Sequence, residues 1–362
     1  MRKLYKRVLV FLCIIGILPA YNVRPQNPSP PPAKEPAQSK PADSKTAAGR
    51  AQHLNAEIQQ IVRQISAERI KSDISKLVGF YTRQTLSDTE SPTRGIGAAR
   101  NWIKSEFDRY SKDSGGRLQV ELDEYTQPPG PRSPNPVKVV NVVATLPGTQ
   151  GESKDRMYVV SGHYDSRVTN VMDATSFAPG ADDDASGTAA VMEMARVMSK
   201  HKFDATIVFM TVAGEEQGLY GSTHWAETAK EKHLDIEGMI NNDIIGSSHA
   251  EDGHIDGTHV RLFAEGVPPV AEMPPDLRTR VRTGGENDSL ACELGRKIKE
   301  TADQYVPSMH VTMIYRRDRF LRGGDHSPFL DRGYAAVRMC EPNEIYRHQH
   351  QDVRKENGVQ YG

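Results

Sequence analysis

Apolar segments of strand length alternate along this chain with segments of helical periodicity, and this alternation limits the possible folds more than any other feature. The strand-like runs cover residues 137–146, 157–161, 206–212, 238–240 and 334–339. The helical runs between them cover residues 188–198, 218–230 and 288–305. Strands that are apolar along nearly their whole length are buried on both faces, which is typical of parallel sheets. We therefore expect an α/β fold with a mostly parallel central sheet flanked by helices on both faces.

The N-terminal part of the chain differs in composition and predicts three regions. Residues 1–20 resemble a signal peptide, with four basic residues, an apolar run and Pro19-Ala20 at the expected cleavage position. Residues 21–52 are rich in Pro, Ala and Lys and predict a disordered linker. Apolar residues at helical spacing in residues 53–80 and 98–110 predict helices that open a single domain of residues 53–362.

A signal peptide predicts a secreted or periplasmic protein. The apolar run of residues 8–18 is too short for a comfortable membrane span, so we expect no stable span once the signal is cleaved. An uncleaved N-terminal anchor is the alternative. The formal net charge is −1 for the whole chain and would be −5 without residues 1–20, which suggests neither nucleic acid nor an anionic surface as a partner.

Acidic and histidine residues follow the strand-like runs or precede a helical one. They are His163, Asp165, the triplet centred on Asp183, Glu215, Glu216, Asp243 and His348. Each residue alone could be an ordinary loop residue or a helix cap. Together they fall where the carboxyl ends of parallel strands form a site. Imidazoles and carboxylates are also the ligands of hydrolytic zinc centres.

Five motifs in this order resemble the co-catalytic di-zinc aminopeptidase family. They are His-Tyr-Asp-Ser, Gly-Ala-Asp-Asp-Asp-Ala-Ser-Gly, Gly-Glu-Glu-Gln-Gly-Leu-Tyr-Gly-Ser, Asn-Asn-Asp and Gly-Asp-His-Ser-Pro-Phe. That family includes secreted bacterial leucyl aminopeptidases and is related to glutamate carboxypeptidase, glutaminyl cyclase and the transferrin receptor. The resemblance covers residues 137–352 and implies a zinc exopeptidase-like fold, peptide substrates and hydrolysis of the N-terminal peptide bond.

The resemblance also implies a role for each motif residue. His163 and Asp243 would bind one zinc ion, Glu216 and His348 the other, and Asp183 would bridge the two. Glu215 would be the general base, and Asp165 would orient His163 through its second ring nitrogen. Two Zn²⁺ ions are expected, which Co²⁺ or Mn²⁺ could replace.

The C-terminal ligand and the substrate contacts are the less determined part of this prediction. His326, His348 and His350 compete for the last ligand position, and His348 with Asp352 fits the family's His-x-x-x-Asp spacing. The family has Thr or Ser after that histidine, where this chain has Gln349. Tyr315 and Arg316 are expected substrate contacts, because Tyr315 or an arginine of the segment with Arg316, Arg317, Arg319 and Arg322 could bind a carboxylate or an oxyanion. His326 is a further expected contact, because its motif resembles the family's Ser-Asp-His-x-x-Phe segment, which lines the pocket.

Three alternatives remain at the level of sequence. A glutaminyl cyclase-like acyltransferase would use one zinc ion, and a carboxypeptidase or dipeptidase could share the same fold. A binding domain without catalysis is the third, against which the intact ligand set and Glu215 argue. We also expect residues 246–285 to wall the substrate pocket, and the domain to lack the C-terminal helix with which such domains close.

Overall fold

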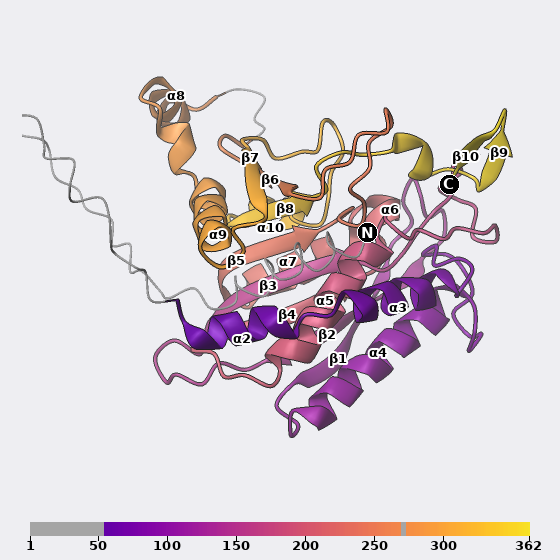
Figure 1. The fold of residues 1–362 in the computed structure, drawn as a ribbon, viewed down its shortest axis with the longest axis horizontal. Helices are drawn as coiled ribbons and strands as arrows, with labels where there is room; N and C mark the ends of the chain where they lie inside the picture. Colours follow the sequence, from indigo (N-terminus) through magenta and orange to yellow (C-terminus); the bar gives the residue numbers. More distant parts are fainter. Residues whose placement is uncertain (1–53, 269–272) are drawn as a thin grey trace, which may run out of the picture.

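The computed structural model describes residues 54–268 and 273–362. The predicted signal peptide and the predicted linker, residues 1–52, lie outside the described residues. The described chain forms a central eight-stranded sheet with the strand order β1-β2-β4-β3-β5-β8-β6-β7 (Figure 1). A small two-stranded ribbon of β9, Arg354–Glu356, and β10, Val359–Tyr361, lies away from the sheet.

The four central strands of the sheet run parallel to one another. They are β4, Thr206–Val212; β3, Arg156–His163; β5, Asp235–Asn242; and β8, Ala336–Cys340. On one side, β2, Val137–Leu146, and β1, Gln119–Gln127, extend the sheet with antiparallel pairing. On the other side, β6, His259–Ala264, pairs antiparallel with β8 and parallel with β7, His310–Ile314. The expected α/β fold with a mostly parallel sheet is confirmed.

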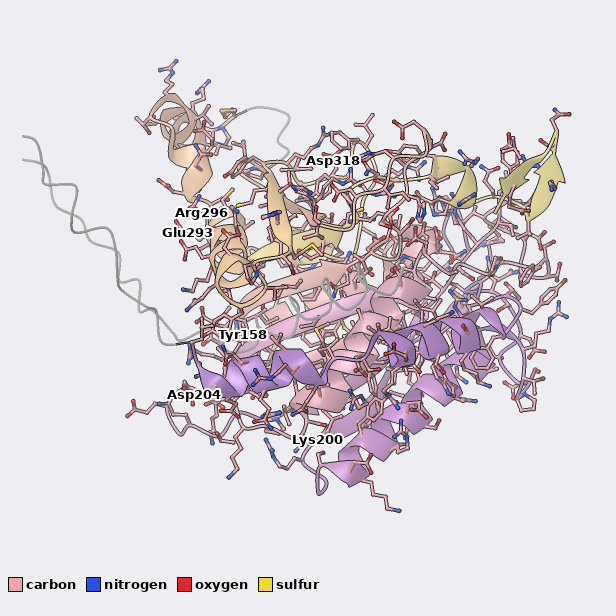
Figure 2. The ribbon with its side chains drawn as sticks, in the orientation of Figure 1. Tyr158, Lys200, Asp204, Glu293, Arg296 and Asp318 are labelled. Carbon is pink, nitrogen blue, oxygen red and sulfur yellow. The ribbon has the colours of Figure 1, made fainter. Side chains whose placement is uncertain are left out.

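Helices pack against one face of the sheet around α5, Ala185–Met198, which is buried along nearly its whole length. Its neighbours on this face are α2, Ala56–Gln64; α3, Ala67–Val78; α4, Gly95–Asp113; and α9, Leu290–Tyr305. Each of α2, α3 and α9 begins at a polar cap, such as Ser289, whose hydroxyl accepts from the N–H of Cys292. The exposed side of α9 is polar, with Arg296 and Glu293 forming an ion pair of 2.6 Å (Figure 2).

The opposite face of the sheet is covered by α7, Tyr220–Glu231, and α10, Ser327–Asp331. Ala226 and Ala229 of α7 pack with Phe329 of α10 against buried valines and methionines of the central strands. Both faces of the sheet are therefore covered, as the apolar strands required. Cys292 and Cys340 are free, buried thiols.

The region after β5 contains regular secondary structure. Residues 246–285 contain β6, described above, and α8, Pro275–Arg282. The short 3-10 turns η1, Gly285–Asp288, and η2, Tyr346–His348, precede α9 and the C-terminal ribbon. Among the helices of the described residues, none is long and apolar enough to cross a membrane.

Candidate active site

The candidate site lies at the carboxyl ends of the parallel strands. His163 is the last residue of β3, and Asp243 directly follows β5. Glu215 and Glu216 begin α6, Glu215–Gly218, which follows β4. Asp183 lies in the loop that leads into α5. Loops from neighbouring strands thus bring these side chains to one edge of the sheet, where sites form in folds of this kind.

Close backbone packing under the site fixes the start of α5. A Cβ atom at Gly187 would overlap the carbonyl oxygen of Asn242, and one at Gly162 would lie 2.5 Å from the carbonyl carbon of Gly187. Asp184 caps α5 by accepting from the N–H of Gly187 at 2.9 Å, and its other oxygen accepts from the N–H of His163 at 3.0 Å. Glycine at these two positions lets the loop of the acidic triplet lie directly against the ends of β3 and β5.

A fully buried arginine connects the loops that carry the site. The Arg83 guanidinium donates to the carbonyl oxygens of Tyr164 at 2.7 Å, Pro179 at 2.7 Å and Gly180 at 2.8 Å. These carbonyls belong to the segment after β3 and to the segment before Asp183. Because a buried guanidinium needs several acceptors, Arg83 fixes the distance between the two segments.

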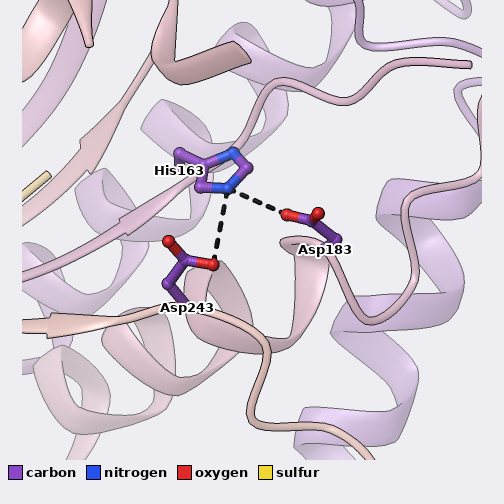
Figure 3. A group of neighbouring side chains, drawn as sticks. All are labelled: His163, Asp183 and Asp243. Atoms are coloured by element: carbon purple, nitrogen blue, oxygen red, sulfur yellow. Dashed lines mark ion pairs between the residues drawn. The ribbon is translucent and has the colours of Figure 1, made fainter. Parts of the chain in front are cut away.

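The first ligand group consists of His163, Asp183 and Asp243 (Figure 3). The Nε2 atom of His163 lies 3.1 Å from Oδ1 of Asp183 and 4.0 Å from Oδ1 of Asp243. All three residues are buried. The imidazole and the two carboxylates point toward one another from β3, the triplet loop and the end of β5, as one ion would require.

The second ligand group shares Asp183 with the first. The Nε2 atom of His350 lies 2.8 Å from Oδ2 of Asp183 and 3.1 Å from Oε2 of Glu216. The two oxygens of the Asp183 carboxylate therefore face two different imidazoles, His163 on one side and His350 on the other. Asp183 is therefore the one residue that both groups share among the described residues.

The expectation that His348 joins this group is wrong, because the position is filled by His350. His348 ends the η2 turn and lines a separate pocket with Pro179 and Glu341. Gln349 then continues in extended conformation and is buried against Glu344, to which its side-chain amide donates at 3.1 Å. The extended step at Gln349 and a positive φ of 52° at His350 bring the second imidazole into the site. The His-x-x-x-Asp spacing selects His348, because a spacing carries no information on which of the two imidazoles the backbone turns toward the site.

The loop of His350 is attached to the segment that follows β3. Arg167 donates from Nη2 to Nδ1 of His350 at 2.8 Å. Asp352 accepts from the N–H of Thr169 at 3.2 Å, and its own N–H donates to the Thr169 hydroxyl at 3.1 Å. Asp352, which the sequence analysis used to select His348, thus positions His350 instead.

Asp165 lies behind His163, and its carboxylate accepts from the backbone N–H groups of Glu215 and Glu216. Its Oδ1 atom lies 3.4 Å from Nδ1 of His163 and accepts from the N–H of Glu215 at 3.3 Å. Its Oδ2 atom accepts from the N–H of Glu216 at 3.2 Å and from the Thr85 hydroxyl at 2.9 Å. Asp165 therefore fixes the His163 ring and the start of α6 relative to each other.

Glu215 projects into the pocket without a partner. Among the described residues, its carboxylate makes no hydrogen bond or ion pair, while Glu216 beside it faces His350. Burial raises the pKa of Glu215 well above its usual range, and the negative charges of Glu216, Asp243 and Asp325 raise it further against the opposing effect of His163. A free carboxyl with a raised pKa has the properties of a general base or acid.

The charge balance of the two groups fits a metal cation. Burial alone would lower the pKa of His350, but the carboxylates of Glu216 and Asp183 outweigh burial and raise it to about 10. The carboxylates of Asp183 and Glu216 therefore favour a positive charge at this position. The ligand atoms of each group lie within 4.8 Å of one another. Imidazole nitrogens together with carboxylate oxygens are the donor set of zinc in hydrolytic sites, so the residues present fit zinc.

A pocket of about 460 Å³ opens over both groups. Asp183, Glu215, Glu216, Asp243 and His350 line its floor. Its remaining lining includes five arginines: Arg132, Arg167, Arg319, Arg322 and Arg338. Within the described part of residues 246–285, no residue lines this pocket, so the expectation that this segment walls it is wrong.

The three expected substrate contacts also lie elsewhere. Tyr315 and Arg316 line a second pocket, and Arg316 is paired with Asp318, which is labelled in Figure 2. His326 is fully buried; its Nε2–H donates to the carbonyl oxygen of Arg317 at 2.6 Å, and burial lowers its pKa to about 3. His326 is a neutral structural residue. The arginine-rich segment of the sequence analysis includes Arg319 and Arg322, which do line the first pocket. Arg338 gave a further signal, because it interrupts an otherwise apolar strand.

A covered, largely parallel sheet with two histidine–carboxylate groups at its carboxyl edge fits the class of zinc-dependent peptidases. Residues 141–357 match peptidase family M28, and the chain belongs to that family. A protein of Leptosphaeria maculans named "Probable zinc metalloprotease" is 54% identical over 306 residues, which cover 84% of this chain and 70% of that protein. The chain spans 60–70% of the length of this relative and of three others named in the same way.

Solved structures agree on the fold. The LapA aminopeptidase of Legionella pneumophila superposes with a TM-score of 0.57 at 19% identity, covering 90% of this chain and 74% of that chain. A glutaminyl cyclase of Porphyromonas gingivalis superposes with a TM-score of 0.53 at 17% identity, covering 80% of this chain and 88% of that chain. At these identities the similarity shows the fold and leaves the reaction to be argued from the site.

Proposed function

We propose that this chain is a di-zinc exopeptidase that hydrolyses the N-terminal peptide bond of peptides. The observation that carries the proposal is the Asp183 carboxylate, whose two oxygens face His163 and His350 separately. His163 and Asp243 would hold one ion, and Glu216 and His350 the other. A mono-zinc cyclase would not need both imidazoles on one shared carboxylate, so this arrangement favours peptide hydrolysis.

The metal ions and the protein would contribute different parts of the chemistry. Zinc, when bound, supplies Lewis-acid polarisation of the scissile carbonyl and acidifies the attacking water. Glu215 takes the proton of that water and passes it to the leaving amine. Burial raises the pKa of Glu215, which suits the second step, because a less acidic carboxyl holds the proton until the amine leaves. Asp165 keeps the Glu215 backbone and the His163 ring in place during the transfer.

The test of this proposal combines metal content with product analysis. Purified protein would be analysed for zinc and assayed with aminoacyl anilides, with acetylated anilides as the control for a free amino terminus. Two zinc ions per chain and release of free amino acids from unblocked substrates alone are the expected results. One zinc ion with ammonia released from N-terminal glutamine would instead establish a cyclase. Cleavage at the carboxyl end would establish a carboxypeptidase.

We further propose that the protein is exported and that residues 1–20 are removed. The support is the basic and apolar pattern of that segment. Expression of the whole chain in a secreting host, followed by N-terminal sequencing, tests this. Protein in the medium that begins near residue 21 is expected, and intact, membrane-bound protein would indicate an anchor.

A further inference from the structure

The pocket over the ligand groups is lined mainly by charged side chains. Its five arginines, Arg132, Arg167, Arg319, Arg322 and Arg338, face four carboxylates, and Leu219 and Leu321 are its large apolar lining residues. Three of the four carboxylates, those of Asp183, Glu216 and Asp243, belong to the ligand groups. When these carboxylates bind divalent cations, the cations neutralise their negative charge. The positive charge of the arginines is then free to attract an anion.

Three of the arginines are already held by the protein. Arg338 Nη2 lies 2.6 Å from Oδ1 of Asp243, and Arg167 Nε lies 3.1 Å from Oε2 of Glu216. Arg319 pairs with Glu344, a carboxylate that also pairs with Arg261. These inner arginines raise the positive potential of the pocket, but their positions are fixed by their partners.

Arg132 and Arg322 have donors to spare. Arg132, in the connection between β1 and β2, donates from Nη1 to the carbonyl oxygen of Glu216 at 2.8 Å. Arg322 reaches Gln349 Oε1 at 3.5 Å and lies 5.4 Å from the centre of the Tyr346 ring. Within residues 54–268 and 273–362, neither guanidinium pairs with a carboxylate. A guanidinium offers five N–H groups, so each has unused donors at the pocket that contains Glu215.

We propose that Arg322 and Arg132 bind a carboxylate group of the substrate. The enzyme would then select peptides that carry an acidic terminal residue, or short peptides with a free α-carboxylate, over neutral ones. An aminopeptidase for large apolar residues needs an apolar wall, and this pocket has charged walls instead. Guanidinium groups bind carboxylates in paired, charge-assisted hydrogen bonds. The carboxylate has two possible sources: the side chain of an acidic terminal residue, or the free α-carboxylate of a short peptide. The proposal rests on the peptidase function proposed above.

Three dipeptides separate the two sources of the carboxylate. Asp-Leu-amide carries only the side-chain carboxylate, Asn-Leu only the terminal carboxylate, and Asn-Leu-amide neither. Their binding would be measured by calorimetry in zinc-containing buffer on the Glu215→Gln protein, which removes the base and leaves the arginines. The kcat/KM values of the unaltered enzyme would be measured in parallel. Because calorimetry needs no turnover, loss of activity would count against the proposed function without hiding the binding preference.

The expected result is that one carboxylate-bearing peptide binds at least about tenfold more tightly than Asn-Leu-amide, since hydrogen bonds to charged groups typically contribute that much. Arg322→Gln or Arg132→Gln should remove most of this preference and change the binding of the neutral peptide less than threefold. Arg316→Gln is the matched control, because Arg316 belongs to the same segment as Arg322 but pairs with Asp318 at another pocket.

Two results would overturn the proposal. Equal binding of all three peptides by the protein with every arginine intact would show that the pocket does not select carboxylates, and that comparison needs no arginine variant to fold. A preference that survives both Arg322→Gln and Arg132→Gln would show that the zinc ions, rather than these arginines, hold the carboxylate.

Discussion

Glu215 and Glu216 are adjacent in sequence and both line the pocket, yet their side chains have different surroundings. Glu216 faces His350 and Arg167, while Glu215 has no partner among the described residues and opens into the pocket. The family resemblance implies that Glu216 is a ligand and Glu215 the base, and these surroundings support that proposal.

Replacing Glu215 by Gln should therefore leave folding and metal content unchanged while removing proton transfer. We expect kcat to fall about 10²–10⁴-fold, the usual contribution of a general base, with two zinc ions still bound. Zinc analysis and steady-state kinetics on the same preparation check this. A variant with nearly full turnover would show that another group takes the proton.

The two C-terminal histidines provide a second comparison at this scale. His350→Ala should lose one of two zinc ions and lower activity at least about 100-fold, more than outer-shell changes usually do. His348→Ala should retain both ions, because His348 lies in a different pocket. The zinc content of the two variants decides between them, and the opposite order would restore the His-x-x-x-Asp assignment.

At the scale of the elements, the sequence predicted the central strands well and the edges poorly. The bounds of β2 and β4 agree with the apolar runs at 137–146 and 206–212. The two edge strands of the sheet, β1 and β7, were not predicted. Their residues are partly exposed, so polar side chains interrupt the apolar pattern. The candidate ligands that follow apolar strands could be located from the sequence. Arg132 and Arg322 lie in irregular loops, whose sequences have no periodic pattern that predicts where their side chains point.

The start of α5 gives a prediction about packing. Gly187→Ala should lower the melting temperature by several degrees or prevent folding, because the new Cβ would overlap the Asn242 carbonyl and the Asp184 cap. Gly151→Ala is the control, since nothing lies within 4 Å of a Cβ atom there. Thermal unfolding of both variants checks this, and equal stability would mean that the α5 loop can move aside.

The contact between α3 and α4 gives a prediction about pH. Burial raises the pKa of Asp73 from 3.8 to about 7, with Arg69 opposing this shift. The folded protein thus holds this proton more tightly than the unfolded chain does, so stability falls as pH rises from about 4 to about 7. Asp73→Asn, which cannot ionise, should raise the melting temperature above pH 7 and have little effect at pH 4. The corresponding gain in the free energy of unfolding is on the order of 2–4 kcal/mol at most. Exposed Asp108→Asn is the control, and a gain that is equal at both pH values would contradict the assignment.

At the scale of the whole molecule, the ligand groups join segments from β3 to beyond β8. Buried carboxylates that repel one another in the absence of a cation should make the fold depend on metal. Zinc should raise the melting temperature of chelator-treated protein by about 5 °C or more at a thousandfold excess over Kd. Asp183→Ala, which removes the shared carboxylate, should lose most of that increase. Differential scanning calorimetry with and without zinc checks both, and an unchanged melting temperature in the unaltered protein would argue against a built metal site.

The distance in sequence between the two imidazoles has a consequence for synthesis. His163 leaves the ribosome early, but His350 is made almost two hundred residues later and reaches the site only through a loop held by Thr169 and Asp352. A nascent chain that already contains β3, β4 and β5 therefore still lacks one of the two imidazoles. The site can be completed only after β8 and the segment that follows it have been made.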